Sequence, residues 1–416
     1  MTPPETVTIP MLQHIGAPSV PVVNVGDSVY VGTLIAEAGG AVGSPMHSSV
    51  SGTVKKIDRF LHSSGKSCQS IIIESDGLMT PDPDIKPPVV TDLDSFIAAV
   101  RASGLVGLGG AGFPTSVKLE AEKRGLVKKI IINGAECEPY ITSDTRTMLD
   151  DGEWVVKGVD ELLKYVSAEE VIIGIEKNKP ACIERMNSLF TSNPKVRVEV
   201  LPSTYPQGAE KILIYNTTGK VVPEGALPAE VGCLVMNVTT VAFIGKYMES
   251  GMPLVEKCVT VDGSAVASPM NVIAPIGSPM SALIECAGGF AAEPKKVMLG
   301  GPMMGIAVYS VEDPIQKNTN AVTAITEADV DSAPMTACIH CGRCTMACPM
   351  GLNPTVYAKA LKLDDIEECM RRLADAKVNL CMECGSCSFV CPARRPLVEN
   401  NKLAKAELRS HLAKKK

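Results

Sequence analysis

Residues 338–349 read CIHCGRCTMACP, and residues 381–392 read CMECGSCSFVCP. Both stretches follow the pattern C-x2-C-x2-C-x3-C-P, and together they take eight of the chain's 15 cysteines. In this pattern three thiolates wrap one [4Fe–4S] cluster while the fourth cysteine reaches the neighbouring cluster. The spacing therefore predicts two clusters. The predicted ligand sets are Cys338, Cys341, Cys344 and Cys391 for one cluster, and Cys381, Cys384, Cys387 and Cys348 for the other.

Two other uses of these cysteines fit the pattern poorly. A zinc site built from two C-x2-C pairs would leave Cys348 and Cys391 unused. Disulfides need an oxidising compartment, whereas the start of the chain, MTPPETVTIP, lacks the basic and apolar stretches of a signal peptide. The remaining seven cysteines are scattered and are interpreted as buried or unreactive thiols: Cys68, Cys137, Cys182, Cys233, Cys258, Cys286 and Cys369.

Length and composition narrow the class of protein further. A chain of 416 residues is long enough for several domains. A net charge of −6 and an aromatic content of 4% argue against a nucleic-acid partner. No stretch approaches the ~18–20 consecutive apolar residues of a membrane span. We therefore expect a multidomain protein outside the bilayer, in a reducing compartment.

The N-terminal 80 residues predict short β-strands. Apolar and polar positions mix in 22–29 and 51–57 around Gly-Asp and Ser-Gly turns. The stretch resembles the barrel-sandwich fold of biotinyl and lipoyl carriers, which present a modified lysine on a hairpin. Here the corresponding stretch, Gly39–His47, contains no lysine. We expect domain 1–80 to be a scaffold, followed by a proline-rich linker at Pro81–Pro88.

Residues 89–250 predict an α/β domain with a parallel, Rossmann-like sheet. It opens with a helix whose apolar face is formed by Leu93, Phe96, Ile97 and Val100. Strands then alternate with helices, which is the rhythm of βαβ units. The predicted strands are Lys129–Asn133, Glu170–Ile175 and Val196–Leu201, and the predicted helices lie around 115–124, 155–166 and 178–190.

Three further segments complete the predicted organisation. Residues 251–310 are β-rich, and 309–335 predict a polar connection. Residues 325–400 form the cluster domain, and 401–416 a basic tail. The cluster domain is predicted to be helical because apolar residues recur at near-helical spacing between the cysteine runs, at Val356, Leu361, Ile366, Met370 and Leu373.

A glycine-rich loop at Gly107–Gly112, GLGGAG, matches G-x-G-x-x-G. The match alone is weak, because a helix and not a strand precedes it. However, Pro114 opens another helix whose amides could face an anion, and Lys118 lies a turn inside. After the next strand, Glu136 and Glu138 could accept hydrogen bonds from a nucleotide's ribose, amide or ring N–H. The alternative interpretation of these two residues is a solvated acidic turn.

Three motifs resemble the flavin- and NADH-binding subunit of respiratory complex I. They are Gly107–Lys118, Asn133–Pro139 (NGAECEP) and Tyr205–Lys211 (YPQGAEK). More closely, the whole chain resembles the RnfC family, whose members belong to Rnf complexes, the membrane-bound ferredoxin:NAD oxidoreductases. The stretches that carry this resemblance, with the two cysteine runs and in the same order, are HIGAP at His14–Pro18, SPMHSSVSG at Ser44–Gly52 and INGAECEPYITSD at Ile132–Asp144. The β-rich stretch 253–305 is similar to the soluble-ligand-binding β-grasp (SLBB) module of these proteins.

The resemblance implies a set of cofactor contacts and no catalytic nucleophile or base. The residues implied to line FMN are Gly109, Gly110, Gly112, Lys118, Asn133, Glu136 and Asn237. Those implied to meet the nicotinamide nucleotide are Phe113, Glu138, Gly208 and Glu210. One position departs from the complex I relatives, because this chain has Ala135 where they carry an acidic residue.

The chemistry of the implied cofactors is coherent. NADH gives up two electrons as a hydride, each cluster carries one electron, and a flavin can mediate between them. The resemblance implies a peripheral protein on the cytoplasmic face of the membrane, coupled to ion translocation by membrane-embedded and ferredoxin-like Rnf subunits, and through them to ferredoxin. Two alternatives stay open: a related NADH reductase for another acceptor such as cobalamin, and a non-catalytic iron–sulfur relay.

Overall fold

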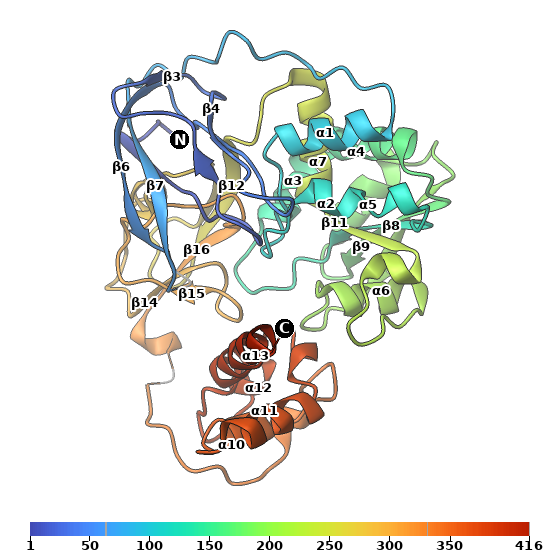
Figure 1. Cartoon of the computed structure of the whole chain (residues 1–416), viewed down its shortest axis with the longest axis vertical. Helices are drawn as coiled ribbons and strands as arrows, with labels where there is room; N and C mark the ends of the chain where they lie inside the picture. The colour runs from blue at the N-terminus through green and yellow to red at the C-terminus, as the bar shows by residue number, and fades with distance from the viewer. Residues whose placement is uncertain (63–64, 331, 416) are drawn as a thin grey trace.

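The computed structural model describes residues 1–62, 65–330 and 332–415, which form four units (Figure 1). An N-terminal β unit and a β-grasp unit lie side by side, with a main-chain hydrogen bond of 2.9 Å from Thr8 to Gly277 between them. An α/β unit lies across from them, and a helical unit lies below (Figure 1). This multidomain α/β architecture is the predicted fold class.

The N-terminal unit contains two small antiparallel sheets, with strand orders β1-β7-β6-β3 and β2-β4-β5. Their inner faces share one apolar core, in which Val7, Ile35 and Ile71 have no exposed surface. The strands are β1 (Thr6–Pro10), β2 (Val20–Pro21), β3 (Ser28–Val29), β4 (Leu34–Glu37), β5 (Met46–His47), β6 (Gly52–Leu61) and β7 (Ser67–Ser75).

The α/β unit is built on a four-stranded parallel sheet with strand order β10-β9-β8-β11. Three of its strands follow the predicted segments closely, and the fourth, β11, was not predicted. The strands are β8 (Lys129–Gly134), β9 (Glu170–Glu176), β10 (Val196–Leu201) and β11 (Cys233–Asn237).

Helices cover both faces of this sheet. On one face Ile130 and Ile132 pack under α4, α5 and α7, and on the other Ile131 packs under α6. The helices of the unit are α1 (Leu93–Ala102), α2 (Thr115–Leu119), η1 (Glu122–Arg124), α3 (Ser143–Asp150), α4 (Gly152–Tyr165), α5 (Pro180–Leu189), α6 (Glu210–Thr218), η2 (Pro228–Val231) and α7 (Val238–Ser250).

The strand order creates a switch point in the sheet. The chain moves outward from β8 to β9 and β10 on one side, and β11 pairs with β8 on the other. In open α/β sheets a ligand crevice forms outside the carboxyl ends of the strands at such a point. The segments after Gly134 and Asn237, which end β8 and β11, therefore border the expected binding crevice.

The β-grasp unit is a mixed five-stranded sheet of order β13-β12-β16-β14-β15, covered by α8. Its central strand β16 has all five residues buried, so the prediction of a polar connection over 309–335 is wrong at this strand. The elements are β12 (Glu256–Asp262), β13 (Met270–Pro275), α8 (Met280–Cys286), β14 (Lys296–Leu299), β15 (Ile306–Ala307) and β16 (Ala321–Ile325).

The helical unit surrounds its own core of Leu352, Tyr357, Leu373 and Leu408. Helix α13 includes residues that were predicted as a basic tail, and it buries Ala404 and Leu408 because it packs on α10 and α11. The elements of this unit and its connection are η3 (Glu327–Asp329), α9 (Arg343–Met346), α10 (Pro354–Ala360), α11 (Ile366–Asp375), η4 (Val378–Leu380), α12 (Ser386–Phe389) and α13 (Leu397–Lys414).

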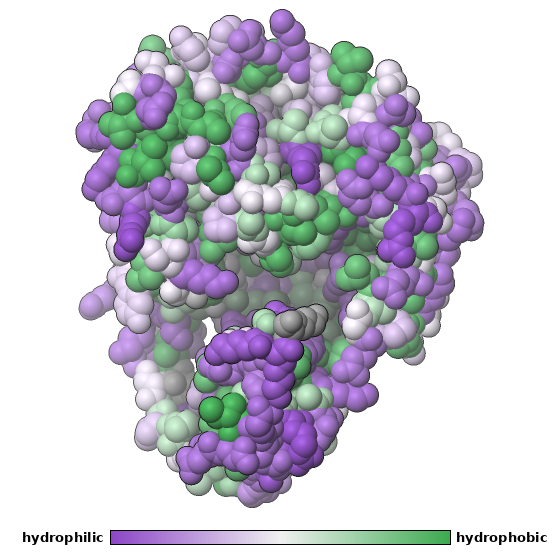
Figure 2. Space-filling model, in the orientation of Figure 1, coloured by the Kyte–Doolittle hydropathy of each residue, from purple (hydrophilic) through white to green (hydrophobic). Residues whose placement is uncertain are grey.

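The surface view shows a hollow between the helical unit and the units above it, and a largely hydrophilic surface along the front of the helical unit (Figure 2). Among the helices in the described part of the chain, none combines the length and the apolar character that a membrane crossing requires.

Candidate nucleotide and cluster sites

The glycine loop presents free main-chain amides. A hydrogen bond of 3.2 Å from the Gly112 amide to the Gly107 carbonyl closes the loop. Within the described chain, the amides of residues 109–111 donate to no protein group. Gly110 has φ +116° and open space where a side chain would begin. Successive free amides on such a loop form an anion-binding concavity, so the loop fits a phosphate group.

The helix after the loop is shorter than predicted. Helix α2 contains only five residues, and a separate 3-10 turn, η1, takes up the rest of the predicted 115–124 segment. A helix this short contributes little dipole at its N-terminus, because the dipole sums over aligned peptide units. The loop amides, rather than the helix, are therefore the main feature that suits an anion.

Four predicted cofactor residues contact one another in pairs. Lys118 Nζ lies 3.3 Å from Glu210 Oε2 and donates to the Val235 carbonyl at 3.0 Å. Asn133 Nδ2 donates to the Gly208 carbonyl at 2.9 Å. The structure thus brings Lys118, Glu210, Asn133 and Gly208 to the same region beside β8 and β11.

The two predicted carboxylates point to different elements. Glu136 accepts hydrogen bonds from the main-chain amides of Asp144 and Thr145, at 2.6 and 3.1 Å, at the start of α3. Glu138 accepts from the amides of Met303 and Met304, at 3.2 and 2.7 Å, in the loop between β14 and β15. Both are half-buried, so neither belongs to a solvated acidic turn, and each ties the end of β8 to another element.

Asn237 caps α7 and reaches an unpredicted partner. Its Oδ1 accepts the amides of Thr239 and Thr240 at 3.0 and 3.2 Å, and its Nδ2 donates to Asp144 Oδ2 at 2.7 Å. A Cβ on Gly109 would lie 3.1 Å from the Asn237 side chain. Glycine at 109 therefore lets the loop approach the N-terminus of α7 closely.

The remaining predicted residues of this region lie on the same loop. Phe113 is half-buried, and its carbonyl accepts the Gly107 amide at 2.8 Å. Gly112 has φ +63° and accepts the Ile15 amide at 3.0 Å. The loop is thus held in shape partly by the HIGAP segment of the N-terminal unit.

Buried charges lie beneath the glycine loop. Burial, followed by the charge of Asp144, raises the pKa of Glu136 to about 8, and burial raises the pKa of Asp144. Lys257 Nζ donates to the Leu108 carbonyl at 2.7 Å, and burial lowers the pKa of Lys257 to about 7. Of these groups, Lys257 contacts the loop directly, and Asp144 binds Asn237, which packs beside Gly109.

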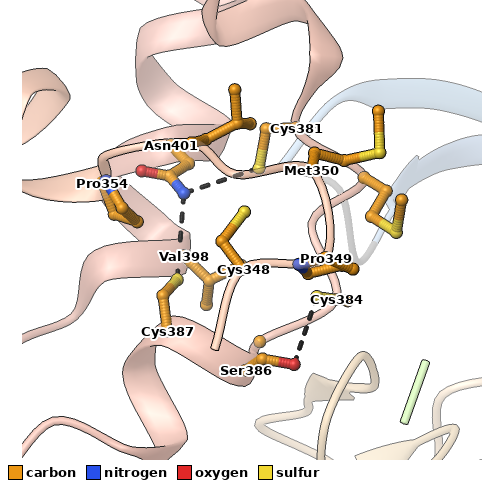
Figure 3. Close-up of a pocket in the computed structure, with 13 residues that line it drawn as sticks. Cys348, Pro349, Met350, Pro354, Cys381, Cys384, Ser386, Cys387, Val398 and Asn401 are labelled. Carbon is orange, nitrogen blue, oxygen red and sulfur yellow. Dashed lines mark hydrogen bonds between the residues drawn. The ribbon is translucent and has the colours of Figure 1, made fainter. Parts of the chain in front are cut away.

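Four cysteines converge in the helical unit, and we call them the inner cysteine site: Cys348, Cys381, Cys384 and Cys387. Figure 3 shows their sulfur atoms, which stand for the thiolates of a cluster, around a common space. Asn401 Nδ2 lies 3.5 Å from Cys381 Sγ and 3.9 Å from Cys387 Sγ (Figure 3). Hydrogen bonds to sulfur are one means by which proteins tune such clusters.

The other four cysteines line a second pocket, and we call them the outer cysteine site: Cys338, Cys341, Cys344 and Cys391. Each pocket takes three cysteines from one run and the fourth from the other, which is the grouping expected from the spacing. Among the described residues, no three His, Cys, Asp or Glu side chains are arranged to hold a metal ion. Each pocket is lined by four cysteines, which is the donor set of a [4Fe–4S] cluster.

The inner cysteine site adjoins the nucleotide region. The Tyr205 hydroxyl, in the YPQGAEK segment, donates to the Cys384 carbonyl at 2.6 Å. A Cβ on Gly385 would lie 2.5 Å from the Met303 carbonyl oxygen, and Gly385 has φ +81°. The loop that contacts Glu138 therefore also packs against the inner site.

Sequence reasoning assigned no role to Asp144, Lys257, Tyr205 and Asn401. Asp144 and Tyr205 belong to the quoted motifs, so motif membership was an available signal. Lys257 gave a weaker signal: a lysine in a strand with apolar neighbours must either point to solvent or form hydrogen bonds with buried acceptors. Asn401 gave none, since its partners lie 14 and 20 residues away.

Family comparisons cover most of the chain in four segments. Residues 1–78 match the RnfC barrel sandwich hybrid domain, and residues 100–246 the Nuo51 FMN-binding domain. Residues 258–307 match the SLBB domain, and residues 333–394 a 4Fe-4S dicluster domain. These matches agree with the predicted order of units.

One solved structure supports the fold alone. An NAD+-reducing [NiFe]-hydrogenase in its air-oxidized state aligns with a TM-score of 0.50 and 18% sequence identity. The alignment covers 77% of this chain and 54% of the hydrogenase chain.

Three curated relatives are similar to this chain along most of their own length. The C subunit of the Na(+)-translocating ferredoxin:NAD(+) oxidoreductase complex of Acetobacterium woodii is 42% identical over 88% of this chain and 83% of its own. Its counterpart in a proton-translocating complex of Clostridium ljungdahlii is 42% identical over 85% and 78%. The C subunit of the ion-translocating oxidoreductase complex of Rhodobacter capsulatus is 38% identical over 100% and 80%. The chain belongs to the RnfC family of the ion-translocating ferredoxin:NAD oxidoreductase complexes.

Proposed function

We propose that this chain is the NAD(H)-handling electron-transfer subunit of an Rnf complex and that it carries FMN and two [4Fe–4S] clusters. The observation that carries the proposal is the contact between Tyr205 and Cys384, because it sets the nucleotide segment against the inner cysteine site. When bound, FMN takes two electrons together from NADH and passes them on one at a time.

The chain's own residues hold and orient the FMN. The free amides of residues 109–111 bind its phosphate, and Lys118 adds a positive charge at the side of the crevice. Asn133 and Asn237 fix the two strand ends that border the crevice. Glu136 acts through α3, which it caps with hydrogen bonds to two amides.

The nicotinamide nucleotide takes the outer part of the same crevice in this proposal. Phe113 supplies an apolar surface, Glu210 accepts hydrogen bonds, and Gly208 lets the chain approach closely. Glu138 sets the position of the Met303–Met304 loop, whose amides it accepts. No side chain needs to exchange a proton with the substrate, so this chain contributes binding, orientation and electron transfer to the reaction.

The eight cysteines of the inner and outer sites are the proposed cluster ligands. We also place the unit boundaries near residues 80, 89, 250 and 325, and we extend the β-grasp unit from the predicted 310 to Ile325, because β16 is its central strand. The relatives' names place them in multisubunit ferredoxin:NAD oxidoreductase complexes. We infer that this chain binds the corresponding membrane-embedded and ferredoxin-like subunits on the cytoplasmic face of the membrane.

An anaerobic reconstitution tests the proposal. The full chain, refilled with iron, sulfide and FMN, is expected to contain about eight irons and one FMN by the cluster stoichiometry, and NADH should bleach both chromophores. Absence of FMN binding and of NADH-dependent dye reduction would instead favour an iron–sulfur relay. Adding cobalamin as the acceptor tests the alternative of a cobalamin reductase, which requires cobalamin to be reduced faster than a ferredoxin.

A further inference from the structure

Two carbonyl groups of the glycine loop are bound by side chains from another unit. Lys257, in β12 of the β-grasp unit, donates from its Nζ to the Leu108 carbonyl at 2.7 Å. Asn318, between β15 and β16 of the same unit, donates from its Nδ2 to the Gly110 carbonyl at 2.8 Å. The conformation of the loop therefore depends on the β-grasp unit as well as on the α/β unit that contains the loop.

These two hydrogen bonds set the direction of two main-chain amides. The peptide bonds that follow Leu108 and Gly110 are trans, and in a planar trans peptide unit the N–H points away from the C=O. Both carbonyls point to the β-grasp unit, so the amides of Gly109 and Ala111 point away from it. These amides are the first and the last of the three free amides that we assign to the phosphate of FMN.

The contact of Lys257 fixes the start of the loop. Lys257 is 4% exposed, and its Nζ also donates to Asn320 Oδ1. A buried ammonium group requires such acceptors, and a hydrogen bond from a charged donor is stronger than one between neutral groups. The amide of Leu108 donates to Thr240 Oγ1, in α7, at 3.0 Å. Both main-chain polar groups of Leu108 are thus bound, each by a different unit.

The contact of Asn318 restrains the middle of the loop. Asn318 is half-buried, and a Cβ on Gly112 would lie 3.3 Å from its Nδ2, so this side chain lies against Gly112 while it binds Gly110. Glycine-rich segments lose much conformational entropy when they become ordered. A loop that is already restrained loses less of this entropy when a ligand binds, which increases the affinity for the ligand.

We propose that Lys257 and Asn318 are positioning residues for the phosphate group of FMN, so that the β-grasp unit completes a site whose other residues lie in the α/β unit. This inference rests on the proposed function, because it takes the free amides of residues 109–111 as the phosphate-binding group. Each of the two side chains acts through the carbonyl that it binds, and not by contact with the phosphate.

The test compares two flavins, FMN and riboflavin, because riboflavin lacks the phosphate. The protein is the full chain with its clusters reconstituted anaerobically and its flavin removed, and quenching of flavin fluorescence gives the Kd for each flavin. The ratio of the two Kd values reports phosphate binding alone, whereas a general loosening of the site weakens both flavins. The test variants are Asn318→Ala and Lys257→Met, measured separately.

Each test variant has a matched control in the β-grasp unit. Asn271→Ala removes a side chain whose Nδ2 also joins this unit to the α/β unit, through a hydrogen bond of 2.8 Å to Thr142 Oγ1. Lys317→Met removes a buried lysine that donates to main-chain carbonyls outside the glycine loop. Both controls remove a contact between units and leave the carbonyls of the glycine loop bound.

We expect Asn318→Ala to raise the Kd for FMN about 3- to 10-fold, and Lys257→Met to raise it about tenfold or more, as for the loss of one neutral and one charge-assisted hydrogen bond. The Kd for riboflavin should stay within about twofold in both variants, and both controls should keep the preference for FMN within about twofold. Full retention of the preference by Asn318→Ala, or equal weakening of both flavins by Lys257→Met, overturns the proposal.

The same titrations separate this inference from the proposed function. An unaltered chain that binds no FMN, or that binds riboflavin as tightly as FMN, contradicts the proposed function. An unaltered chain that prefers FMN, together with test variants that keep this preference, contradicts only the role of the β-grasp unit. If Lys257→Met does not fold, Asn318→Ala decides alone, because Asn318 is half-buried and uncharged.

Discussion

The hydroxyl of Tyr205 lies 2.6 Å from the main-chain carbonyl oxygen of Cys384, although the two residues are 179 positions apart in the chain. Tyr205 belongs to the loop that leads into α6 and Glu210, and Cys384 belongs to the inner cysteine site. This hydrogen bond joins the α/β unit to the helical unit at the place where electrons would cross between them.

Tyr205→Phe removes this bond and leaves the Cys384 carbonyl without its donor. A neutral hydrogen bond contributes about 0.5–1.5 kcal/mol, so we expect faster hydrogen exchange in residues 381–387 and slower reduction of the clusters by NADH, with dye reduction at the flavin unchanged. The matched control is Tyr357→Phe, since that hydroxyl donates to the Ala376 carbonyl at 2.8 Å within the helical unit. Equal behaviour of the two variants would show that the contact does not couple the units.

Lys118→Met and Glu210→Gln should affect the binding of two different ligands, FMN and NADH respectively. A charge-assisted hydrogen bond contributes about 1.5–3 kcal/mol, so Lys118→Met should raise the Kd for FMN by about 10- to 100-fold. Glu210→Gln should retain FMN and raise the KM for NADH. Flavin fluorescence titration and steady-state kinetics measure the two effects. The assignment is wrong if Glu210→Gln loses FMN while Lys118→Met keeps it.

Asn401→Leu removes the amide that faces Cys381 Sγ and Cys387 Sγ. Donors near cluster sulfurs stabilise the more negative, reduced state, so their loss lowers the reduction potential. If the hydrogen bonds stabilise the reduced cluster by about 0.5–1 kcal/mol more than the oxidised cluster, their loss lowers the potential by about 20–40 mV for one electron. An EPR-monitored redox titration should show this decrease for one cluster and no change for the other. A shift of both clusters, or of neither, contradicts the assignment of Asn401 to the inner cysteine site.

His47 should make the N-terminal unit sensitive to acid. Burial, followed by the charge of Lys317, lowers the pKa of His47 to about 3, whereas the unfolded chain has its ordinary value of about 6.5. Between these values the unfolded state binds the extra proton, so stability falls as the pH falls below 6.5. Between pH 7 and pH 5, one such histidine lowers the free energy of unfolding by about 2 kcal/mol.

His47→Gln should remove that part of the pH dependence. Hydrogen exchange of β4 and β5 amides at pH 7 and pH 5 measures the local unfolding free energy. Because β4 pairs with β5 through Leu34 and His47, these amides report on the site. A difference between the two pH values as large as in the unaltered chain would exclude His47 as the cause. His14, whose pKa burial lowers to about 4, serves as a second position for the same test.

Parts of the fold followed from local patterns. The predicted strand at Val196–Leu201 agrees with β10, and those near Lys129 and Glu170 agree with β8 and β9 to within a residue at each end. Strands β8 and β9 are buried in the middle of the parallel sheet, so their apolar runs are continuous and easy to recognise. The edge strand β10 instead alternates apolar and charged residues. Strand β16 escaped prediction because it is short, rich in alanine and flanked by polar residues, and only its pairing with β12 and β14 makes it central.

The sequence predicted the residues of the candidate site better than it predicted the contacts between them. The sequence identified Lys118, Glu210, Glu136 and Glu138 as members of one region. It did not indicate that Lys118 and Glu210 contact each other, or that each of the other two carboxylates caps main-chain amides of a different element. Those contacts join segments separated by up to 166 residues, and local periodicity carries no information about such distances.

The sequence by itself indicated which cysteines can share a pocket, because the gaps of two residues hold three thiolates of each run together and the pattern assigns the fourth cysteine to the other cluster. It also determined the α/β character of the middle of the chain, because buried parallel strands require apolar runs. Only the tertiary structure decided that the site containing Cys381, Cys384 and Cys387 contacts Tyr205 of the α/β unit and that Cys341 of the other site is exposed. The two cysteine runs are nearly equivalent in sequence, so their order along the electron path depends on how the helical unit packs against the others.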